Sequence, residues 1–493
     1  MERGQINKLT KEDVTVVDTK IAKKSIFGTS LGNAMEWFDF GIYSYLAVTI
    51  GKVFFPEIDP SVQLIYAFAT FAVAFIARPI GGLVFGMLGD RIGRKKVLAI
   101  TLIMMAVATL SIGLIPGYAT IGAAAPVLLL IARLVQGFST GGEYAGAMTF
   151  IAESTPDKKR SFMSSFLEVG TLVGFIAGSG LVTLLTFLLG SETMLAWGWR
   201  IPFFIAAPLG MIGLYFRSHL EETPAFKEMK ETTKERKDQA SLKKIFTDHW
   251  RSLLICIGVV FFYNTVNYMI LTYMPSYLSE QIGFGEMKGL VLILFVMIAM
   301  IPCVLLMGRW ADRIGRNRLI IAGLIGTIVL SIPAFYLMDT GSSVGAFIGL
   351  LVLSCLFTSF QGTLPAALPS LFFTEVRYGS LALTYNVSTS IFGGTTPLMV
   401  AWLVKATGVN MLPAYFLIGV CVIGLFVVTL FVKETGGRSL RGSKPTVEHE
   451  SEAAGLDPKT AFWWKEELVK REEQAGISPG LLGSQQKNVS NLQ

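Results

Sequence analysis

The sequence carries little charge for its length. Asp, Glu, Lys and Arg together make up 16% of its 493 residues, whereas soluble globular proteins carry about 25%. Hydrophobic residues make up 52% of the chain, and the mean hydropathy is +0.57. This composition excludes an ordinary soluble domain and indicates a chain that lies mainly in a lipid bilayer.

Several residue groupings that carry chemistry are missing. The four cysteines have no short spacing between them, and the three histidines lie in polar segments and form no recognisable nucleophile–base grouping. Neither a metal site, a cofactor nor a nucleophile–base pair is therefore expected. The chain also lacks a phosphate-binding loop that ends in Gly-Lys-Ser/Thr and a TVGYG filter. We therefore expect neither an enzyme, nor an ATP-driven pump, nor a channel.

Long apolar segments recur from residue 25 to residue 433, each close to the roughly 20 residues that a helix needs to cross a bilayer. They predict an all-α membrane protein with twelve transmembrane helices. The predicted spans are 26–50, 62–86, 97–116, 124–150, 162–189, 198–217, 252–280, 288–308, 319–338, 343–366, 380–404 and 411–432. Because residues 1–24 are polar and the first span carries two acids, we expect the N-terminus to be retained rather than removed as a signal peptide.

Basic residues mark alternate loops along the chain. The loops after the second, fourth and eighth spans are rich in Arg and Lys, and the other loops carry only isolated cases. The positive-inside rule then predicts that the two termini and the long 218–250 loop are cytoplasmic. We expect the chain to lie in a bacterial inner membrane. This topology accounts for the net charge of +7 without a nucleic-acid partner.

An internal repeat predicts the architecture. Residues 86–96 (GMLGDRIGRKK) return at an offset of 222 as residues 308–318 (GRWADRIGRNR), and Glu153 falls on Glu375 at the same offset. Two related six-helix halves in parallel are typical of the major facilitator fold. The expected division is a cytoplasmic N-terminal segment 1–25, a first half 26–217, a linker 218–250, a second half 251–433 and a cytoplasmic tail 434–493.

The repeated loops also predict a cytoplasmic gate. An Asp and several Arg at helix ends form ion pairs that close one side of a transporter and break when that side opens. The alternative is plain topology-setting charge, which requires no Asp and no glycine at fixed positions. The predicted gate residues are Gly86, Asp90, Arg91, Gly93, Arg94, Gly308, Asp312, Arg313, Gly315 and Arg316.

Several motifs carry a resemblance to a known family. They are GNAMEWFDFGIY (32–43), the 86–96 loop, RLVQGFSTGGEY (133–144), WGWRIPFF (197–204) and EETPAF (221–226). Together they resemble the metabolite:proton symporters of the major facilitator superfamily. Three further stretches are similar to the proline/betaine:proton symporters of that family: AESTPDKKRSFMSSFLEVG (152–170), YMILTYMPSYLS (268–279) and PAY at Pro413.

The resemblance implies uptake of a small zwitterionic osmolyte together with protons, by a chain that acts as a monomer. Organic-anion:proton symport, as in citrate and 2-oxoglutarate carriers, is the alternative, and a transport-dead sensor on the same fold is another. The best-known proline/betaine symporters end in a coiled coil, but residues 441–493 hold no sustained heptad repeat. Osmosensing through such a tail is therefore not expected.

Charged residues inside predicted spans are candidates for proton coupling, because burying a charge in lipid is costly. In the first span Asn33, Glu36, Asp39 and Tyr43 share one helical face. The alternative is a satisfied structural network. The resemblance implies that Arg133 in the fourth span tunes the proton affinity of a carboxylate. The proton-coupling candidates are Glu36, Asp39, Arg133, Glu143 and Glu168.

Recognition of a betaine, which has no ammonium N–H to donate, depends on negative charge and aromatic faces. An acidic lining at Glu168 suits such a cation. The substrate-binding candidates are Asn33, Trp37, Tyr43, Gln136, Tyr144, Tyr263, Asn264 and Asn267, with Tyr45 and Tyr268 as further aromatic neighbours. Arg78 lies near Gly81 and Gly82, whose small size favours close helix packing there over contact with substrate.

Overall fold

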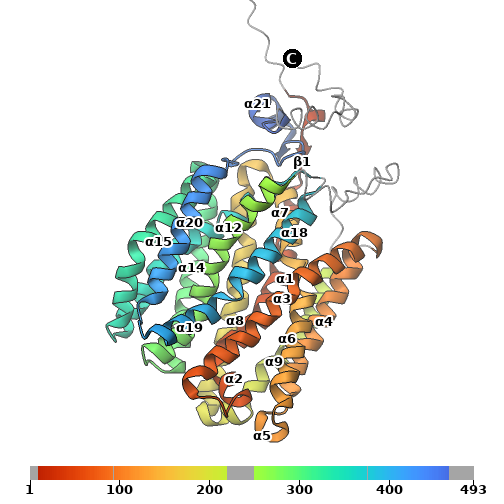
Figure 1. Ribbon diagram of the computed structural model, residues 1–493. Helices are drawn as coiled ribbons and strands as arrows, with labels where there is room; N and C mark the ends of the chain where they lie inside the picture. The colour runs from red at the N-terminus through yellow and green to blue at the C-terminus, as the bar shows by residue number, and fades with distance from the viewer. Residues whose placement is uncertain (1–8, 93, 219–248, 375, 466–493) are drawn as a thin grey trace, which may run out of the picture.

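The protein is an α-helical bundle in which the first and second halves of the chain lie beside each other (Figure 1). The computed structural model describes residues 9–92, 94–218, 249–374 and 376–465. The first half comprises α1 (Thr19–Tyr45), α2 (Ala47–Phe54), α3 (Pro60–Ile92), α4 (Arg94–Leu114), α5 (Tyr118–Ile121), α6 (Ala124–Ser139), α7 (Glu143–Glu153), η2 (Asp157–Lys159), α8 (Arg160–Ala196), η3 (Gly198–Arg200) and α9 (Ile201–Ser218).

The second half repeats this plan with more irregular helices. Its elements are α12 (Trp250–Tyr268), η4 (Met269–Tyr273), α13 (Met274–Ser276), η5 (Tyr277–Gln281), α14 (Glu286–Ile314), α15 (Arg316–Asp339), α16 (Ser343–Gln361), α17 (Leu364–Ala367), η6 (Pro369–Leu371), α18 (Arg377–Ser388), η7 (Thr389–Gly393), α19 (Thr396–Thr407) and α20 (Leu412–Phe431). The elements η4, η5 and η7 are π-helical.

Twelve passes follow from these elements. Within the described residues, nine helical segments are long and apolar enough to cross a membrane. The remaining three passes are the charged helix α1 and two shorter apolar stretches, Ile100–Leu114 and Gly198–Ile212. The twelve-helix, all-α architecture predicted from the sequence is therefore confirmed.

Breaks in the helices recur in the two halves at nearly the same 222-residue offset as the loop motif. The fourth pass is interrupted at Thr140–Gly142, between α6 and α7, and the tenth at Gly362–Thr363, between α16 and α17. The first pass breaks at Leu46 and the seventh becomes π-helical at Met269. Each pair lies 222 or 223 residues apart, so the duplication extends from the loops into the membrane.

The two halves meet along two helix pairs. On one side α8 packs along α14, where a Cβ at Gly308 would lie 2.8 Å from the Ser165 hydroxyl oxygen. On the other side α3 packs against α18, η7 and α19. Asn386 donates a hydrogen bond to the Gly141 carbonyl there, and Ser390 donates one to the Phe75 carbonyl. Direct contact between the halves surrounds the central residues, which are consequently closed off from solvent.

Within the first half, α3 and α6 approach so closely that only glycine fits at their crossing. A Cβ at Gly137 would lie 1.6 Å from the Ala74 carbonyl oxygen. We expect Gly137→Ala to lower the free energy of unfolding by about 2 kcal/mol or more, because overpacking forces the helices apart. Thermal unfolding of the purified protein, followed by intrinsic fluorescence, measures this loss.

The control for that change is Gly180→Ala in α8. The nearest atom to a Cβ there is Leu294 Cδ1 at 3.9 Å, which is ordinary contact. Removing a helical glycine stabilises a helix by roughly 0.5–1 kcal/mol, so the midpoint should hold or rise. Equal destabilisation by both variants would contradict the close-packing explanation for Gly137.

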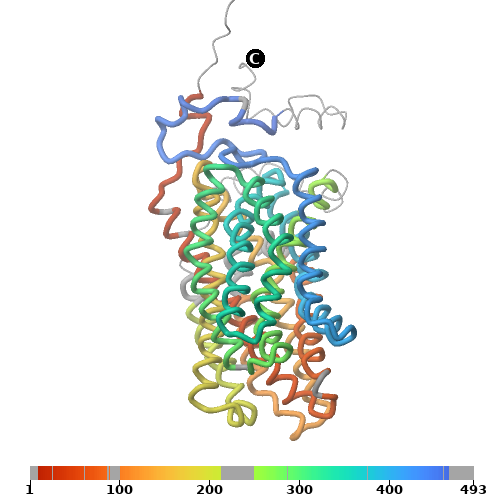
Figure 2. The backbone as a smooth tube through the Cα atoms, turned by 90° about the vertical axis from the view of Figure 1, so that its left-hand side faces the viewer, coloured from red at the N-terminus to blue at the C-terminus, as the bar shows by residue number. Residues whose placement is uncertain are grey.

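A small domain lies at the end of the bundle where both termini emerge (Figures 1 and 2). We call residues 9–18 and 434–465 the terminal cap. Strand β1 (Thr15–Val16) pairs in parallel with strand β2 (Thr446–Val447). The other short elements of the cap are η1 (Lys11–Asp13), η8 (Glu450–Gly455) and α21 (Pro458–Ala461). The first part of the predicted tail is therefore folded against the protein.

Aromatic residues fix the cap to the bundle. Phe462 and Trp464 pack with Leu9, Ala461 and Phe373, and Trp464 is only 1% exposed. The Trp464 indole N–H donates to the Ser439 hydroxyl at 3.2 Å. The sequence of residues 458–473 also allowed a short helix with Phe462, Trp463 and Trp464 at the membrane interface. In the structure α21 spans only Pro458–Ala461 and Trp464 is buried in protein contacts, while residues 466–473 lie outside the described part of the chain.

The cap touches both halves through buried arginines. Arg160, at the start of α8, donates to the Arg438 carbonyl at 2.9 Å, and Arg377, at the start of α18, donates to the Arg441 carbonyl at 2.7 Å. Exposed ion pairs join Lys158 to Glu452 at 3.4 Å and Lys159 to Glu448 at 2.7 Å. The backbone N–H of Thr446 also donates to Asp157 at 3.2 Å. The cap therefore bridges the two halves at this end.

Glu452 illustrates the electrostatics of the cap. Partial burial acts to raise its pKa, but backbone N–H donors at His449 and Glu448 and the charge of Lys158 outweigh burial, so the pKa lies below its usual value. A carboxylate whose pKa is lowered by folding contributes stability that is present at neutral pH and is lost as the pH falls through the lowered pKa. The contacts of Glu452 are therefore intact at physiological pH.

Candidate functional site

A buried ion pair lies on the inner wall of the first half. Arg78 of α3 donates from Nη2 to Oε1 of Glu36 on α1 at 3.0 Å, and both side chains are 1% exposed. The rings of Phe40 and Phe75 lie 5.4 and 5.3 Å from the guanidinium carbon. The predicted packing near Arg78 is present as well, since a Cβ at Gly81 would lie 1.8 Å from the Phe138 carbonyl oxygen.

A second buried network joins Asp39 to Arg133 through neutral side chains. The Thr109 hydroxyl donates to Asp39 at 3.1 Å and accepts from the Gln136 amide at 2.9 Å. The Gln136 carbonyl oxygen in turn accepts a hydrogen bond from Arg133. The Arg133 guanidinium lies 4.2 Å from the ring centroid of Tyr43. The polar face predicted on the first span and residues Arg133 and Gln136 of the fourth span thus meet inside one half.

Glu168 of α8 forms a third arrangement, at the boundary between the halves. It accepts a hydrogen bond from the Tyr144 hydroxyl of α7, and the Gln361 amide of α16 donates to it at 3.4 Å. The hydroxyls of Tyr144 and Tyr263 lie 3.5 Å apart. Among the described residues no Lys or Arg forms an ion pair with Glu168, which is 0% exposed. Unlike Glu36, this carboxylate has only neutral partners.

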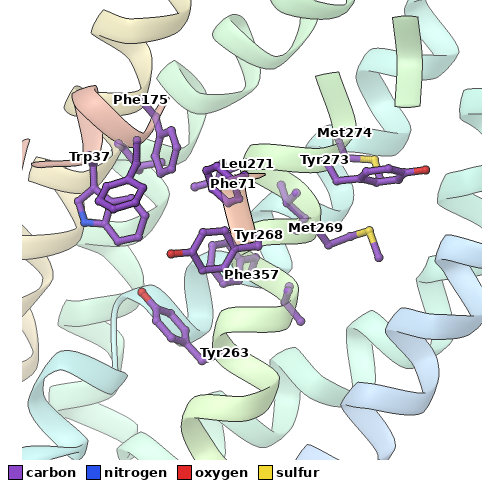
Figure 3. Packing of buried hydrophobic residues seen from close by; sticks show 14 of the residues in the cluster. Trp37, Phe71, Phe175, Tyr263, Tyr268, Met269, Leu271, Tyr273, Met274 and Phe357 are labelled. Atoms are coloured by element: carbon purple, nitrogen blue, oxygen red, sulfur yellow. The ribbon is translucent and has the colours of Figure 1, made fainter. Parts of the chain in front are cut away.

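Buried aromatic rings pack together next to these groups, and Figure 3 shows Trp37, Tyr263 and Tyr268 among them. Trp37 lies 6.1 Å from Tyr268 and 6.2 Å from Tyr144 between ring centroids, and Tyr144 lies 4.9 Å from Tyr385. The hydroxyls of Tyr263 and Tyr268 both point towards the side on which Trp37 lies. We call Trp37, Tyr144, Tyr263, Tyr268 and Tyr385 the aromatic cage; each is at most 3% exposed.

Some predicted substrate-binding residues also make structural contacts. Asn33 donates to the Leu167 carbonyl at 2.9 Å and to the Thr171 hydroxyl at 2.8 Å, and it accepts from the Trp37 indole at 3.1 Å. It joins α1 to α8 and orients Trp37. Tyr43 donates to the Ala67 carbonyl at 3.1 Å. Gln136 belongs to the Arg133 network, as described above.

Other predicted residues lie nearer the boundary between the halves. Asn264 donates to the Thr389 hydroxyl at 2.7 Å and accepts from Tyr385 at 3.4 Å. Asn267 is 2% exposed, and its side-chain oxygen has no hydrogen-bond partner in the described part of the chain. Glu143 begins α7 and is 6% exposed. An acid there interacts favourably with the helix dipole, which is a structural role for Glu143.

Three residues of these arrangements were missed by the sequence analysis. Gln361 and Tyr385 complete the surroundings of Glu168, and Arg377 forms an ion pair with Glu153 at 2.6 Å across the halves. The polar Gln361 at the end of an otherwise apolar span was a usable signal. Tyr385 resembled the other tyrosines of the chain, and its selection required the three-dimensional arrangement.

The junction between α14 and α15 makes contact across the halves. Asp312 accepts hydrogen bonds from the backbone N–H groups of Ser161 and Phe162, both at 2.9 Å, and so caps the start of α8. Arg316 donates to the Ser161 hydroxyl at 2.9 Å. Gly315 has φ of +100°, a conformation that favours glycine, and a Cβ there would lie 2.6 Å from Glu434.

The other predicted gate residues either form no ion pair in the described part of the chain or have side chains that lie outside it. Arg313 is exposed, with no ion pair within the residues that the structure describes. In the first-half copy of the loop, Gly93 and the side chains of Asp90, Arg91 and Arg94 lie outside the described residues, and Gly86 is described only as part of α3. Their gate roles remain predictions.

Comparison with known proteins settles the family. The sequence matches the family model of the Major Facilitator Superfamily over residues 29–372 and again over residues 287–471. The chain belongs to the Major Facilitator Superfamily. Within it, the resemblance drawn from the sequence motifs is confirmed by relatives that are curated as transporters, not enzymes.

Two relatives and one solved structure illustrate the likeness. The proline/betaine transporter of Salmonella typhimurium is 48% identical over 460 residues, which is 92% of each chain. The glycine betaine/proline/ectoine/pipecolic acid transporter OusA of Dickeya dadantii is 46% identical over 461 residues, covering 92% of this chain and 91% of OusA. The Major Facilitator Superfamily proton:xylose symporter XylE, bound to 6-bromo-6-deoxy-D-glucose, shares the fold with a TM-score of 0.70 at 19% identity, covering 86% of this chain and 98% of XylE.

Proposed function

We propose that this protein is a secondary active transporter that imports a small zwitterionic osmolyte, such as proline or glycine betaine, together with protons by alternating access. The observation that carries the proposal is Glu168, a buried carboxylate with neutral partners only, beside the aromatic cage and between the halves. A carboxylate next to aromatic faces suits a quaternary ammonium, which donates no hydrogen bond. The names of the two curated relatives support the same substrate class.

The buried acids of the first half supply the proposed proton coupling. Glu36 and Asp39 each lie beside an arginine or its network, so a change in their protonation would rearrange those contacts. Glu143 and Glu168 complete the set of acids, and Arg133 tunes Asp39. Because Asp39 and Arg133 both belong to one half, their coupling to substrate runs through the shared helix α1.

Alternating access would use the contacts at the capped end of the bundle as a gate. Asp312 and Arg316 connect the halves there, and we propose that these contacts break when that end opens. We place this end and both termini in the cytoplasm, with the halves at 26–217 and 251–433 joined by the 218–250 linker, and we expect the monomer to be the working unit.

Uptake of radiolabelled proline and glycine betaine into proteoliposomes tests the proposal. With an inward proton gradient we expect accumulation above the external concentration, and a protonophore should abolish it. Citrate and 2-oxoglutarate, tested in parallel, should not accumulate. Uptake of the organic anions alone would replace the zwitterion with an anionic substrate, and no uptake of any of the four would contradict a transport role.

The gate can be tested separately through Asp312. Asp312→Asn removes the charge that caps α8, which is worth about 1 kcal/mol, or roughly a fivefold shift towards opening. Ser164 is buried on α8. In a Ser164→Cys background, a membrane-impermeant maleimide added at the capped end should react with the introduced thiol about fivefold faster when Asp312→Asn is present. Arg318→Gln, at an exposed basic residue of the same region that is not a predicted gate residue, should leave the rate unchanged. Equal rates for both variants would remove Asp312 from the gate.

A further inference from the structure

Arg78 is buried with part of its hydrogen-bonding capacity unused. A guanidinium carries five N–H donors. The contact with Glu36 uses Nη2, whereas Nε has no hydrogen-bond partner within the described residues. Buried donors without acceptors are rare in folded proteins. An unused donor on a side chain that is 1% exposed indicates that Arg78 has a further acceptor at another stage of the protein's cycle.

The position of Arg78 indicates what that acceptor is. Tyr268 of the second half packs on Phe75, which covers the guanidinium, with 5.3 Å between the ring centroids. The Tyr268 hydroxyl lies near this guanidinium, although it makes no hydrogen bond of ordinary geometry among the described residues. Tyr385 lies close enough to Glu168, Arg78 and Glu36 for charge interactions with all of them. The aromatic cage therefore has a carboxylate, Glu168, on one side and a cation, Arg78, on the other.

That polarity is complementary to a zwitterion. We propose that Arg78 binds the carboxylate of the substrate, while Glu168 and the aromatic cage receive its cationic end, and that Glu36 occupies Arg78 when the site is empty. This assignment rests on the proposed function, and it reverses the packing role that the sequence favoured for Arg78. An arginine fits the task because its planar donors match a carboxylate.

The assignment explains why substrate and proton bind together. When the substrate carboxylate takes over Arg78, Glu36 loses its cation in surroundings that are nearly dry. A buried carboxylate without a cation binds a proton more readily, since the neutral form is cheaper to bury. The only bond formed is the O–H bond of protonated Glu36: one proton from the surrounding water adds to this carboxylate as one substrate carboxylate pairs with Arg78. By reciprocity, protonation of Glu36 must strengthen substrate binding by the same factor.

Other ionisable groups surround Glu36 and enter any pH dependence. On α1 itself the neighbouring acid is Asp39, and the Glu36 charge also reaches Tyr268 and Tyr385 in the second half. The described ionisable residues on the elements that pack against this part of α1 are Arg78, Arg133, Glu143, Tyr144, Glu168 and Tyr273. Because Asp39 and Glu168 are also ionisable, the contribution of Glu36 is measured as the difference between matched variants.

Binding of glycine betaine to the purified full-length protein, measured by isothermal titration calorimetry across a pH series, tests the exchange. Wild-type protein should bind more tightly as the pH falls. Glu36→Gln mimics the protonated acid and frees Arg78, so it should bind at least about fivefold more tightly at alkaline pH, with a flatter pH profile. Weaker binding by Glu36→Gln would overturn the exchange, because that is the result expected of a merely structural ion pair.

Competition by choline, which has the quaternary ammonium but no carboxylate, tests the role of Arg78. Wild-type protein should strongly favour glycine betaine. Arg78→Gln should weaken betaine binding by about 30-fold or more and leave choline binding nearly unchanged, so the preference collapses. If Arg78→Gln does not fold, Arg78→Lys keeps the charge without the paired donors and should lose part of the preference.

The outcomes separate the two proposals. If wild-type protein binds betaine and an Arg78 variant keeps the wild-type preference over choline, Arg78 only holds α1 to α3, and the inference fails alone. If wild-type protein binds neither proline nor betaine, the proposed function fails and the inference fails with it. Glu192→Gln, an exposed acid near the far end of α8, is the matched control and should bind both ligands as wild-type does.

Discussion

Glycine betaine uptake by Glu168→Gln is expected to fall about 100-fold or more, while the protein remains folded in the membrane. The glutamine amide has nearly the same shape as the carboxylate and still accepts the hydrogen bond of Tyr144. The fold loses little, since the recorded partners of Glu168 are neutral. The substrate loses the charge that offsets its cation in a dry site, and an uncompensated buried charge costs several kcal/mol.

Initial uptake rates in proteoliposomes, normalised to reconstituted protein, measure this effect. The control is Glu192→Gln, which removes an exposed acid from the same helix and should transport at the wild-type rate. Thermal unfolding of both variants shows whether the loss reflects misfolding. Wild-type uptake by Glu168→Gln would exclude this carboxylate from both substrate binding and proton coupling.

Asp39→Asn is expected to abolish accumulation but to retain exchange. Asp39 lies in the Thr109–Gln136–Arg133 network. Within the described residues, no hydrogen bond joins Asp39 to the aromatic cage. An asparagine oxygen still accepts from Thr109, so the helices stay in place. Without an ionisable group at this position, the proton gradient can no longer drive accumulation of the substrate. The substrate still binds and crosses the membrane in both directions.

Counterflow distinguishes this outcome from simple inactivation. Liposomes preloaded with unlabelled betaine should take up labelled betaine at a rate within about threefold of wild-type, a barrier change below 1 kcal/mol. The same variant should show no proton-driven accumulation from empty liposomes. Loss of both activities would assign Asp39 a structural or substrate-binding role, and normal accumulation would remove it from coupling.

Hydropathy and the internal repeat predicted the fold well because both can be recognised in the sequence without knowledge of any tertiary contact. A span needs only about 20 apolar residues, and the 222-residue offset fixed the relation of the halves before any contact was known. The structure extends the offset to helix breaks such as Thr140 and Gly362. The sequence did not predict the folding of residues 434–465 against the bundle, because their burial depends on partners hundreds of residues away, such as Asp157 and Arg160.

Helical periodicity placed the candidate residues on the correct faces but could not assign their partners. Glu36 and Asp39 share a face of α1, yet one forms an ion pair with Arg78 and the other binds Thr109. The absence of a cation beside Glu168 depends on which helices surround it, and no sequence pattern reports that. Asp312 was expected in an ion pair, whereas the structure gives it the backbone N–H groups of a helix in the other half.

The terminal cap sets a length limit on the motion of the halves. The Arg438 carbonyl is held by Arg160 of the first half, and the Arg441 carbonyl by Arg377 of the second. Three residue steps of fully extended chain reach about 10 Å. While both hydrogen bonds hold, the short segment from Arg438 to Arg441 keeps the first turns of α8 and α18 together. One of the two arginines must therefore release its carbonyl before this end of the bundle opens widely. Breaking a hydrogen bond to the tail is then a step that precedes each opening of this end.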